Sequence, residues 1–291
     1  MKRVLITGAS GFVGSWLLKT APGNVEILAQ YHQRKIPFLP PHAAALQLNL
    51  LQPDWKRALA FEPKVILHCA ALASPESCEA QPEAAQQINF SAAAQLCDLA
   101  VQIGARLIFT STDLVYGGAR GCYSESDPPQ PINVYTRAKV EAERYILANH
   151  PDAVAARCAL VYGRSLHGQP TFTETVIERL RRGEPVALFC DEYRTPIPVD
   201  ALAAALWELA GNEFTGILNL GGAEKVSRYD MGRIICETLS LPESLLLPRK
   251  IVEMRFAAAR APDCSLDVSL ARRVLTTPLP GFAKGITRIL G

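Results

Sequence analysis

Three glycines near the N-terminus lie between an apolar run and a segment with helical spacing, and they limit the folds open to this chain. The apolar run is residues 4–7, the helical segment is residues 12–19, and the glycines are Gly8, Gly11 and Gly14. Gly8 permits a tight turn, Gly11 lets the backbone approach a phosphate, and Gly14 allows close helix–strand packing. A helix N-terminus also offers free N–H groups and a positive dipole end, which together bind a pyrophosphate. We therefore predict a nucleotide-binding loop formed by Gly8, Ser10, Gly11, Phe12, Val13 and Gly14.

Short apolar runs alternate with helical segments through the first half of the chain. The predicted strands are residues 4–7, 25–30, 65–69, 107–111 and 153–160, and the helical segments are residues 12–19, 82–103 and 134–148. Near-continuous apolar strands are typical of a parallel sheet covered on both faces. The alternation of strand and helix predicts an α/β fold with a doubly wound parallel sheet.

The pattern changes after about Gly163. Helical segments are expected at residues 172–182, 200–210 and 229–239, with short strands at residues 186–189 and 216–220 between them. This predicts a smaller, mixed α/β substrate-binding lobe at the C-terminal end. The expected domains are residues 1–163, which bind the cofactor, and residues 164–291, from which the chain can cross back to the first domain.

Composition argues against several classes of protein. Lysine and arginine number 30 and aspartate and glutamate 28, so the net charge is +2, and 49% of the 291 residues are hydrophobic. A near-neutral chain lacks the charge expected of a protein that binds nucleic acid or an anionic membrane. The longest uncharged run, residues 36–53, contains prolines that preclude a membrane helix. The eight cysteines are scattered, so we expect no metal site, reduced thiols and a cytoplasmic location.

The end of the second predicted strand indicates which dinucleotide the chain binds. An acidic residue there would bind the ribose of NAD, but the sequence offers only Ala29, Gln30 and Tyr31. Arg34 and Lys35 follow closely, and they either bind a 2′-phosphate or stand in solvent as loop cations. NADP is therefore preferred over NAD. The cofactor-binding residues expected from this region are Arg34, Asn49 and Leu50, where Asn49 meets the adenine edge unless it is a turn residue.

A tyrosine and a lysine four residues apart lie on a predicted helix. Because Tyr135 and Lys139 are separated by one turn, their side chains share a face. A phenol is a poor acid–base group near neutrality, and a nearby ammonium lowers its pKa toward the range that carbonyl reduction needs. Pairs at this spacing also arise by chance, but Thr112 ends a predicted strand at the sheet edge where ligands bind. We predict that Thr112, Tyr135 and Lys139 are catalytic residues.

These features occur in the order and spacing of the extended short-chain dehydrogenases/reductases, which the sequence resembles. The resemblance rests on residues 7–14, 68–71, Asn89, residues 111–117, Tyr135 with Lys139, and residues 157–163. It implies a Rossmann-type domain, a nicotinamide cofactor and a nucleotide-activated sugar as substrate. It also implies that Thr112 polarises the substrate, that Tyr135 is the acid–base residue, and that Lys139 assists Tyr135 and binds the nicotinamide ribose. Tyr135 and Lys139 are thus both expected among the cofactor-binding residues. Further cofactor-binding residues implied by the second motif are Cys69, Ala70 and Ala71.

Within that superfamily the chain is most similar to dTDP-4-dehydrorhamnose reductases. The matching pieces are residues 111–116, 191–200 and 260–267. The similarity implies NAD(P)H-dependent reduction of a 4-keto nucleotide sugar and a homodimer. The expected substrate-binding residues are Thr112, Asp113, Tyr135 and Arg194. Asp113 either steers the substrate or caps a turn, and Arg194 either contacts the diphosphate or is a surface cation paired with Asp191 or Glu192.

Three other functions compete with this one. A sugar-nucleotide 4,6-dehydratase typically has Asp-Glu after the threonine, whereas here Asp113 is followed by Leu114. The missing carboxylate argues against a dehydratase. A nucleotide-sugar epimerase shares the Thr–Tyr–Lys set and stays open. A non-catalytic role also stays open, because the regulatory subunit of methionine adenosyltransferase resembles the same reductases and acts by binding a partner enzyme.

Overall fold

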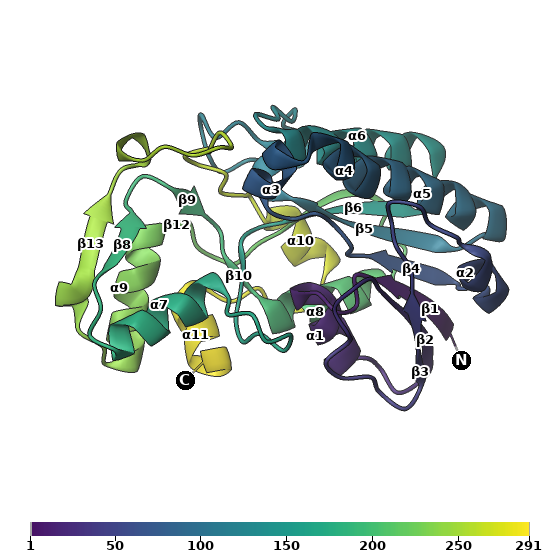
Figure 1. Ribbon diagram of the computed structural model, residues 1–291, viewed down its shortest axis with the longest axis horizontal. Helices are drawn as coiled ribbons and strands as arrows, with labels where there is room; N and C mark the ends of the chain where they lie inside the picture. The colour runs from purple at the N-terminus through teal and green to yellow at the C-terminus, as the bar shows by residue number, and fades with distance from the viewer. Residues whose placement is uncertain (1, 291) are drawn as a thin grey trace.

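A seven-stranded sheet with helices on both faces lies beside a smaller lobe in the computed structural model, which describes residues 2–290 (Figure 1). The strand order is β11-β6-β5-β4-β1-β2-β3, and every neighbouring pair is parallel. The predicted doubly wound Rossmann-type sheet is therefore confirmed. Its strands are β1 (Lys2–Thr7), β2 (Val25–Tyr31), β3 (Ala43–Gln47), β4 (Val65–His68), β5 (Arg106–Thr112), β6 (Ala153–Cys158) and β11 (Gly216–Leu220).

Two hydrophobic cores explain why both faces of these strands are apolar. One core lies between the sheet and α1 (Phe12–Lys19), α8 (Val199–Leu209) and α10 (Ser269–Val274). The other lies between the sheet and α2 (Lys56–Phe61), α5 (Ala92–Ile103) and α6 (Val134–Asn149). Alternate residues of one strand serve different cores, since Val4 and Ile6 of β1 belong to the first and Leu5 to the second. A strand buried on both faces must be apolar throughout.

The strand order reverses between β1 and β4. From β1 the chain builds outward through β2 to β3, and from β4 it builds in the opposite direction through β5 to β6. The crevice outside the carboxyl ends of the strands at such a reversal is where open α/β sheets bind ligands. The glycine loop follows β1, and Thr112 is the last residue of β5. Both therefore lie at the edge of the sheet where a ligand is expected.

The smaller lobe, at the left of Figure 1, has a third hydrophobic core. Its main elements are α7 (Phe172–Arg181), β8 (Val186–Phe189), α9 (Arg228–Leu239), β13 (Leu246–Arg249) and α11 (Phe282–Leu290). β8 and β13 pair in parallel, and α7, α9 and α11 supply apolar side chains to the core. Short strands lie between the two parts, namely β7 (Val161–Tyr162), β9 (Tyr193–Arg194), β10 (Ile197–Pro198) and β12 (Val226–Ser227). The 3-10 turns η3 (Glu243–Leu245) and η4 (Ile251–Glu253) flank β13 in the smaller lobe.

Two segments differ from the sequence prediction. Residues 216–220 were expected as a strand between the helices of the smaller lobe, but β11 pairs with β6 and extends the large sheet. Residues 82–103 were expected as one helix, but they form α4 (Pro82–Gln86), a π-helical segment η1 (Gln87–Ser91) and α5. Asn89 lies in the π-helical segment, and its side-chain amide bonds both the N–H and the carbonyl of Leu72. A π-bulge of this kind is frequent at functional sites.

No helix among residues 2–290 is both long and apolar enough to cross a membrane. The same residues contain no group of three or more histidine, cysteine, aspartate or glutamate side chains that could hold a metal ion.

Candidate active site

The glycine loop has a geometry that side chains would block. Gly8 has a φ of +67°, and a Cβ on it would lie 2.7 Å from the backbone nitrogen of Ala70. A Cβ on Gly14 would lie 2.2 Å from the carbonyl oxygen of Gly8. Gly11 is the N-cap of α1 and no side chain caps that helix, so first-turn N–H groups remain for a ligand. The loop therefore fits the pyrophosphate of a dinucleotide, which is the ligand that the sequence predicts here.

Gln30 occupies the place where an acid would bind a ribose. Its Oε1 accepts a hydrogen bond from the Gly8 N–H at 2.9 Å, and its Nε2 donates one to the Leu48 carbonyl at 2.7 Å. The side chain is buried and ties the end of β2 to the glycine loop. This amide, which is hydrogen-bonded through both its oxygen and its nitrogen, replaces the carboxylate typical of NAD-binding folds.

The other residues expected around the adenosine lie outside the main cavity. Arg34 is exposed and donates to Nδ1 of His167 at 3.2 Å. The Asn49 side chain accepts a hydrogen bond from the Leu51 N–H at 3.0 Å, which is the turn contact considered as its alternative. Leu50 is buried in a core. The cofactor roles of Arg34, Asn49 and Leu50 stay predictions.

Thr112, Tyr135 and Lys139 line one cavity of about 400 Å³ at the carboxyl ends of the strands. Cys69 and Ala71, which follow β4, line it as well, whereas Ala70 packs under Gly8. The structure thus brings the three predicted catalytic residues together beside the second cofactor motif.

The start of α6 fixes the position of Tyr135. Asn133 caps the helix by accepting from the Thr136 N–H at 2.9 Å, and its Nδ2 donates to the Ala259 carbonyl at 3.1 Å. The Val134 N–H donates to the carboxylate of Glu79 in α3 (Pro75–Ala80) at 2.8 Å. The helix is held on two sides, so the phenol has a defined place in the cavity.

Burial dominates the protonation of the tyrosine and the lysine. It raises the pKa of Tyr135, an effect that the Thr112 hydroxyl opposes. It lowers the pKa of Lys139 to about 8. The sequence suggested that the ammonium would lower the pKa of the phenol, but Nζ of Lys139 donates to the Thr110 carbonyl at 2.6 Å. In this structure the effect of burial on the pKa of the phenol is larger than that of the hydrogen bond with Thr112.

Asp113 is a buried carboxylic acid that lines the cavity at the start of the turn η2 (Asp113–Val115). Its Oδ1 accepts from the Thr112 hydroxyl at 3.3 Å, and its Oδ2 lies 3.7 Å from Nε of Arg194. Burial raises the pKa of Asp113 to about 6, and Arg194 and Arg228 offset only part of that rise. The carboxyl therefore changes charge near neutral pH.

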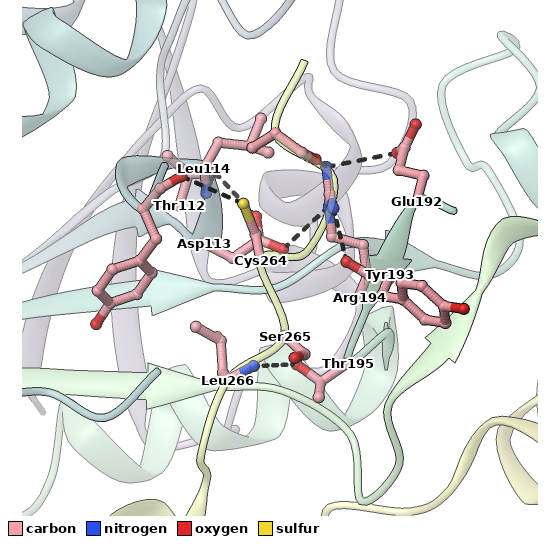
Figure 2. A network of polar contacts seen from close by, with 12 residues as sticks. Thr112, Asp113, Leu114, Glu192, Tyr193, Arg194, Thr195, Cys264, Ser265 and Leu266 are labelled. Carbon is pink, nitrogen blue, oxygen red and sulfur yellow. Dashed lines mark hydrogen bonds and ion pairs between the residues drawn. The ribbon is translucent and has the colours of Figure 1, made fainter. Parts of the chain in front are cut away.

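Arg194 is a buried link and not the surface cation considered as its alternative, since 4% of its surface is exposed. Figure 2 shows its guanidinium between Asp113 and Glu192. It also donates to the carbonyls of Tyr193 and Ala261, at 2.6 and 3.2 Å. The expected pairing with Glu192 exists, at 3.5 Å. Contact between Arg194 and a substrate diphosphate stays a prediction.

Glu192 also contacts two further arginines: Arg228, which the sequence did not single out, and Arg260, which begins the matching piece 260–267 but to which the sequence assigned no role. Arg228 lies 2.9 Å and Arg260 3.3 Å from its carboxylate, and all three residues line the cavity. Burial alone would raise the pKa of Glu192, but Arg228 and Arg194 hold it below its ordinary value. The sequence did not show that these residues meet, because Glu192, Arg228 and Arg260 lie in three segments far apart in the chain.

Histidine and cysteine side chains near the site are uncharged. Nδ1 of His68 lies 2.6 Å from the Thr7 hydroxyl, and burial lowers the pKa of His68 to about 3. Burial raises the pKa of Cys69 to about 12 and also raises that of Cys158. Thiols held in the protonated form are poor nucleophiles.

A doubly wound sheet, a glycine loop after its first strand and a Thr–Tyr–Lys set at its carboxyl edge define an extended short-chain dehydrogenase/reductase. The particular family follows from comparison. The chain belongs to the family described as "RmlD substrate binding domain", which matches residues 1–291.

Three relatives illustrate the range of this group. Methionine adenosyltransferase 2 subunit beta from Danio rerio is 31% identical over 277 residues, which cover 92% of this chain and 83% of that protein. A hypothetical dTDP-4-dehydrorhamnose reductase from Sulfolobus tokodaii is 30% identical, with a TM-score of 0.84 over 97% of this chain and 98% of that one. MoeE5 in complex with UDP-glucose and NAD is 28% identical, with a TM-score of 0.80 over 98% of this chain and 96% of that one.

Proposed function

We propose that this protein is an NAD(P)H-dependent reductase of a 4-keto nucleotide sugar. The observation that carries the proposal is the meeting of Thr112, Tyr135 and Lys139 in one cavity beside the glycine loop. The family, the related reductase and the relative that binds UDP-glucose and NAD support the reaction class and the kind of substrate.

Each residue has a defined part in this reaction. A nicotinamide dinucleotide, when bound, would supply the hydride for the keto carbon. Thr112 orients the keto oxygen by hydrogen bonding, and Tyr135 gives that oxygen its proton. Lys139 binds the nicotinamide ribose and, when charged, favours the phenolate that remains. The loop of residues 8–14 holds the pyrophosphate with backbone N–H groups at the start of α1.

NADP is the preferred cofactor in this proposal, and NAD is the alternative. Gln30 carries an amide where NAD-binding folds have a carboxylate. Both ends of that amide are already hydrogen-bonded, so Gln30 is not free to bind a ribose 2′-hydroxyl. Arg34 is exposed at the same end of β2 and carries a positive charge toward a 2′-phosphate.

The arginine cluster supports an anionic substrate. Arg228 and Arg260 line the cavity and are held by Glu192. Arg194 is saturated by carbonyls and carboxylates, so we assign the diphosphate mainly to Arg228 and Arg260, with Asp113 positioned to accept from a sugar hydroxyl.

The location and oligomeric state are separate parts of the proposal. Because all eight cysteines are free thiols, we propose a cytoplasmic location. Homodimer formation stays a prediction.

A second candidate function, that of a regulatory subunit, rests on the similarity to methionine adenosyltransferase 2 subunit beta.

The test of the proposed reductase activity is consumption of NADPH or NADH by the purified protein with a panel of 4-keto nucleotide sugars. We expect consumption with at least one of them. Inversion at C4 of the corresponding 4-hydroxy nucleotide sugars, without net consumption of the dinucleotide, would indicate an epimerase instead. No turnover, together with cofactor binding and capture of an adenosyltransferase, would identify the regulatory role.

A further inference from the structure

The loop of residues 164–170, between β7 and α7, crosses the start of α1. The indole N–H of Trp16 in α1 donates to the carbonyl of Arg164 at 2.8 Å, which fixes the beginning of the loop. Further along, the ring of His167 meets the ring of Phe12 edge-on, with centroids 6.2 Å apart and planes at 89°. Phe12 is the first residue of α1 and part of the glycine loop. His167 therefore stands over the segment that fits a pyrophosphate.

His167 also reaches the segment that follows β2. Its Nδ1 lies 3.2 Å from NH1 of Arg34. Because a guanidinium only donates hydrogen bonds, Nδ1 is the acceptor and we assign the ring proton to Nε2. The contact joins residues that are 133 positions apart in the sequence. Because the imidazole of His167 is neutral, this contact does not balance the positive charge of Arg34.

Hydrogen bonds within the loop and to the start of α7 hold its shape. Both carboxylate oxygens of Glu174 accept from the Ser165 N–H at 3.1 Å, and Glu174 also closes a capping box with Thr171 at the start of α7. The His167 N–H donates to the Ser165 hydroxyl at 3.3 Å. These bonds hold the imidazole beside Arg34, so little ordering is needed on binding.

We propose that His167 and Arg34 together bind the 2′-phosphate of NADP, so that a loop leading into the smaller lobe helps to select the cofactor. The inference rests on the proposed dinucleotide site. In a doubly wound fold the adenosine ribose lies at the end of the second strand, next to the glycine loop. Arg34 follows the second strand, and His167 contacts Phe12 in the glycine loop. A phosphate between the two side chains would accept from the guanidinium and from the imidazole.

The charges around His167 predict that binding is linked to a proton. Burial and the Arg34 guanidinium lower the pKa of His167, and the Glu174 carboxylate raises it; Phe12 of α1 contributes no charge. A phosphate dianion added beside the ring would favour the imidazolium. The ring therefore takes up a proton when NADP binds near neutral pH, and it takes up none with NAD.

Binding of NADP⁺ and NAD⁺ measured by calorimetry tests this without any turnover. We expect His167→Ala and Arg34→Ala each to weaken NADP⁺ binding about tenfold, as for loss of one charge-assisted hydrogen bond, and to leave NAD⁺ within about twofold. His32→Ala is the matched control, because His32 is an exposed histidine on the same segment as Arg34; it should change neither affinity. Calorimetry in two buffers of different ionisation enthalpy should show less proton uptake with NADP⁺ for His167→Ala than for the wild type.

Two results would overturn the inference and leave the dinucleotide site intact. One is equal weakening of both cofactors by His167→Ala, which would show that the loop only supports the fold. The other is unchanged NADP⁺ affinity with unchanged proton uptake. Failure of the wild-type protein to bind either dinucleotide would instead refute the cofactor site on which the inference rests.

Discussion

The carboxylate of Glu143 accepts hydrogen bonds from Nε and NH2 of Arg157, at 3.1 and 2.7 Å, and both side chains are almost completely buried. Glu143 lies one turn after Lys139 on α6, and Arg157 lies on β6. The pair therefore fixes the rotation of the helix that carries Tyr135 and Lys139 relative to the sheet. NH1 of Arg157 also donates to the Tyr116 hydroxyl at 2.7 Å, so the guanidinium is bonded on two sides.

Removal of one member of this pair should destabilise the protein strongly. Glu143→Ala leaves a buried guanidinium without its counter-ion, and we expect the free energy of unfolding to fall by about 3–5 kcal/mol. Denaturant unfolding measures the change. Glu141→Ala on the same helix is the control, because Glu141 is exposed and should shift stability by no more than about 0.5 kcal/mol. Equal stability of the two variants would show that the buried pair does not hold α6.

The phenol of Tyr135 should be essential for turnover and dispensable for cofactor binding. Tyr135→Phe removes the proton donor, and we expect kcat to fall by about 10²–10⁴-fold, with the dissociation constant for NADP⁺ changed less than about threefold. Steady-state kinetics and calorimetry measure the two quantities. Tyr145→Phe provides a tyrosine control on the same helix, whose hydroxyl bonds Asp98 away from the cavity. Undiminished turnover of Tyr135→Phe would refute the assigned role.

Asp113 should make stability depend on pH below neutrality. Its pKa is about 6 in the folded protein, against the ordinary value of 3.8. Between these values the folded chain holds a proton that the unfolded chain has lost, so stability is greatest below about pH 4 for this group and declines as pH rises to about 6. The decline is about 3 kcal/mol. In urea unfolding from pH 4 to 7, the free energy of unfolding of the wild type minus that of Asp113→Asn should decline by this amount. Parallel curves for the two proteins would contradict the raised pKa.

Features that are local in the sequence were predicted well. The glycine loop could be placed because strand, turn and helix follow one another within residues 2–19, and its close contacts involve Gly8 and Gly14 themselves. Thr112 could be placed because an apolar strand ends at it. Lys139 and Tyr135 share a helix face by spacing alone.

Features that depend on distant segments were not predictable. β11 joins the large sheet because β6 presents an unpaired edge to it, and nothing in residues 216–220 states which strand will be the partner. Glu192 binds Arg228 and Arg260, which are 36 and 68 positions away. Arg194 resembles a surface cation in sequence, and only the packing of residues 261–262 over it shows that it is buried.

Glu192 should control both stability and the response to a nucleoside diphosphate. Its carboxylate lies within 3.5 Å of three guanidinium groups, those of Arg194, Arg228 and Arg260. Glu192→Gln removes the carboxylate paired with Arg228. Among residues 2–290 it leaves Arg194 only Asp113, at 3.7 Å, and Arg260 only Glu76, at 3.0 Å. Since Arg194 is buried and Arg228 is mostly buried, the free energy of unfolding should fall by about 3–5 kcal/mol.

A ligand diphosphate would replace the lost charge. We therefore expect dTDP or UDP to raise the melting temperature of Glu192→Gln more than that of the wild type, because a ligand bound only by the folded state stabilises it by mass action. Thermal unfolding with and without each nucleotide measures the difference. Glu213→Gln, at an exposed acid outside the cavity, should respond like the wild type. A smaller nucleotide shift in Glu192→Gln would show that the glutamate supports ligand binding directly and that the arginines are not its anion site.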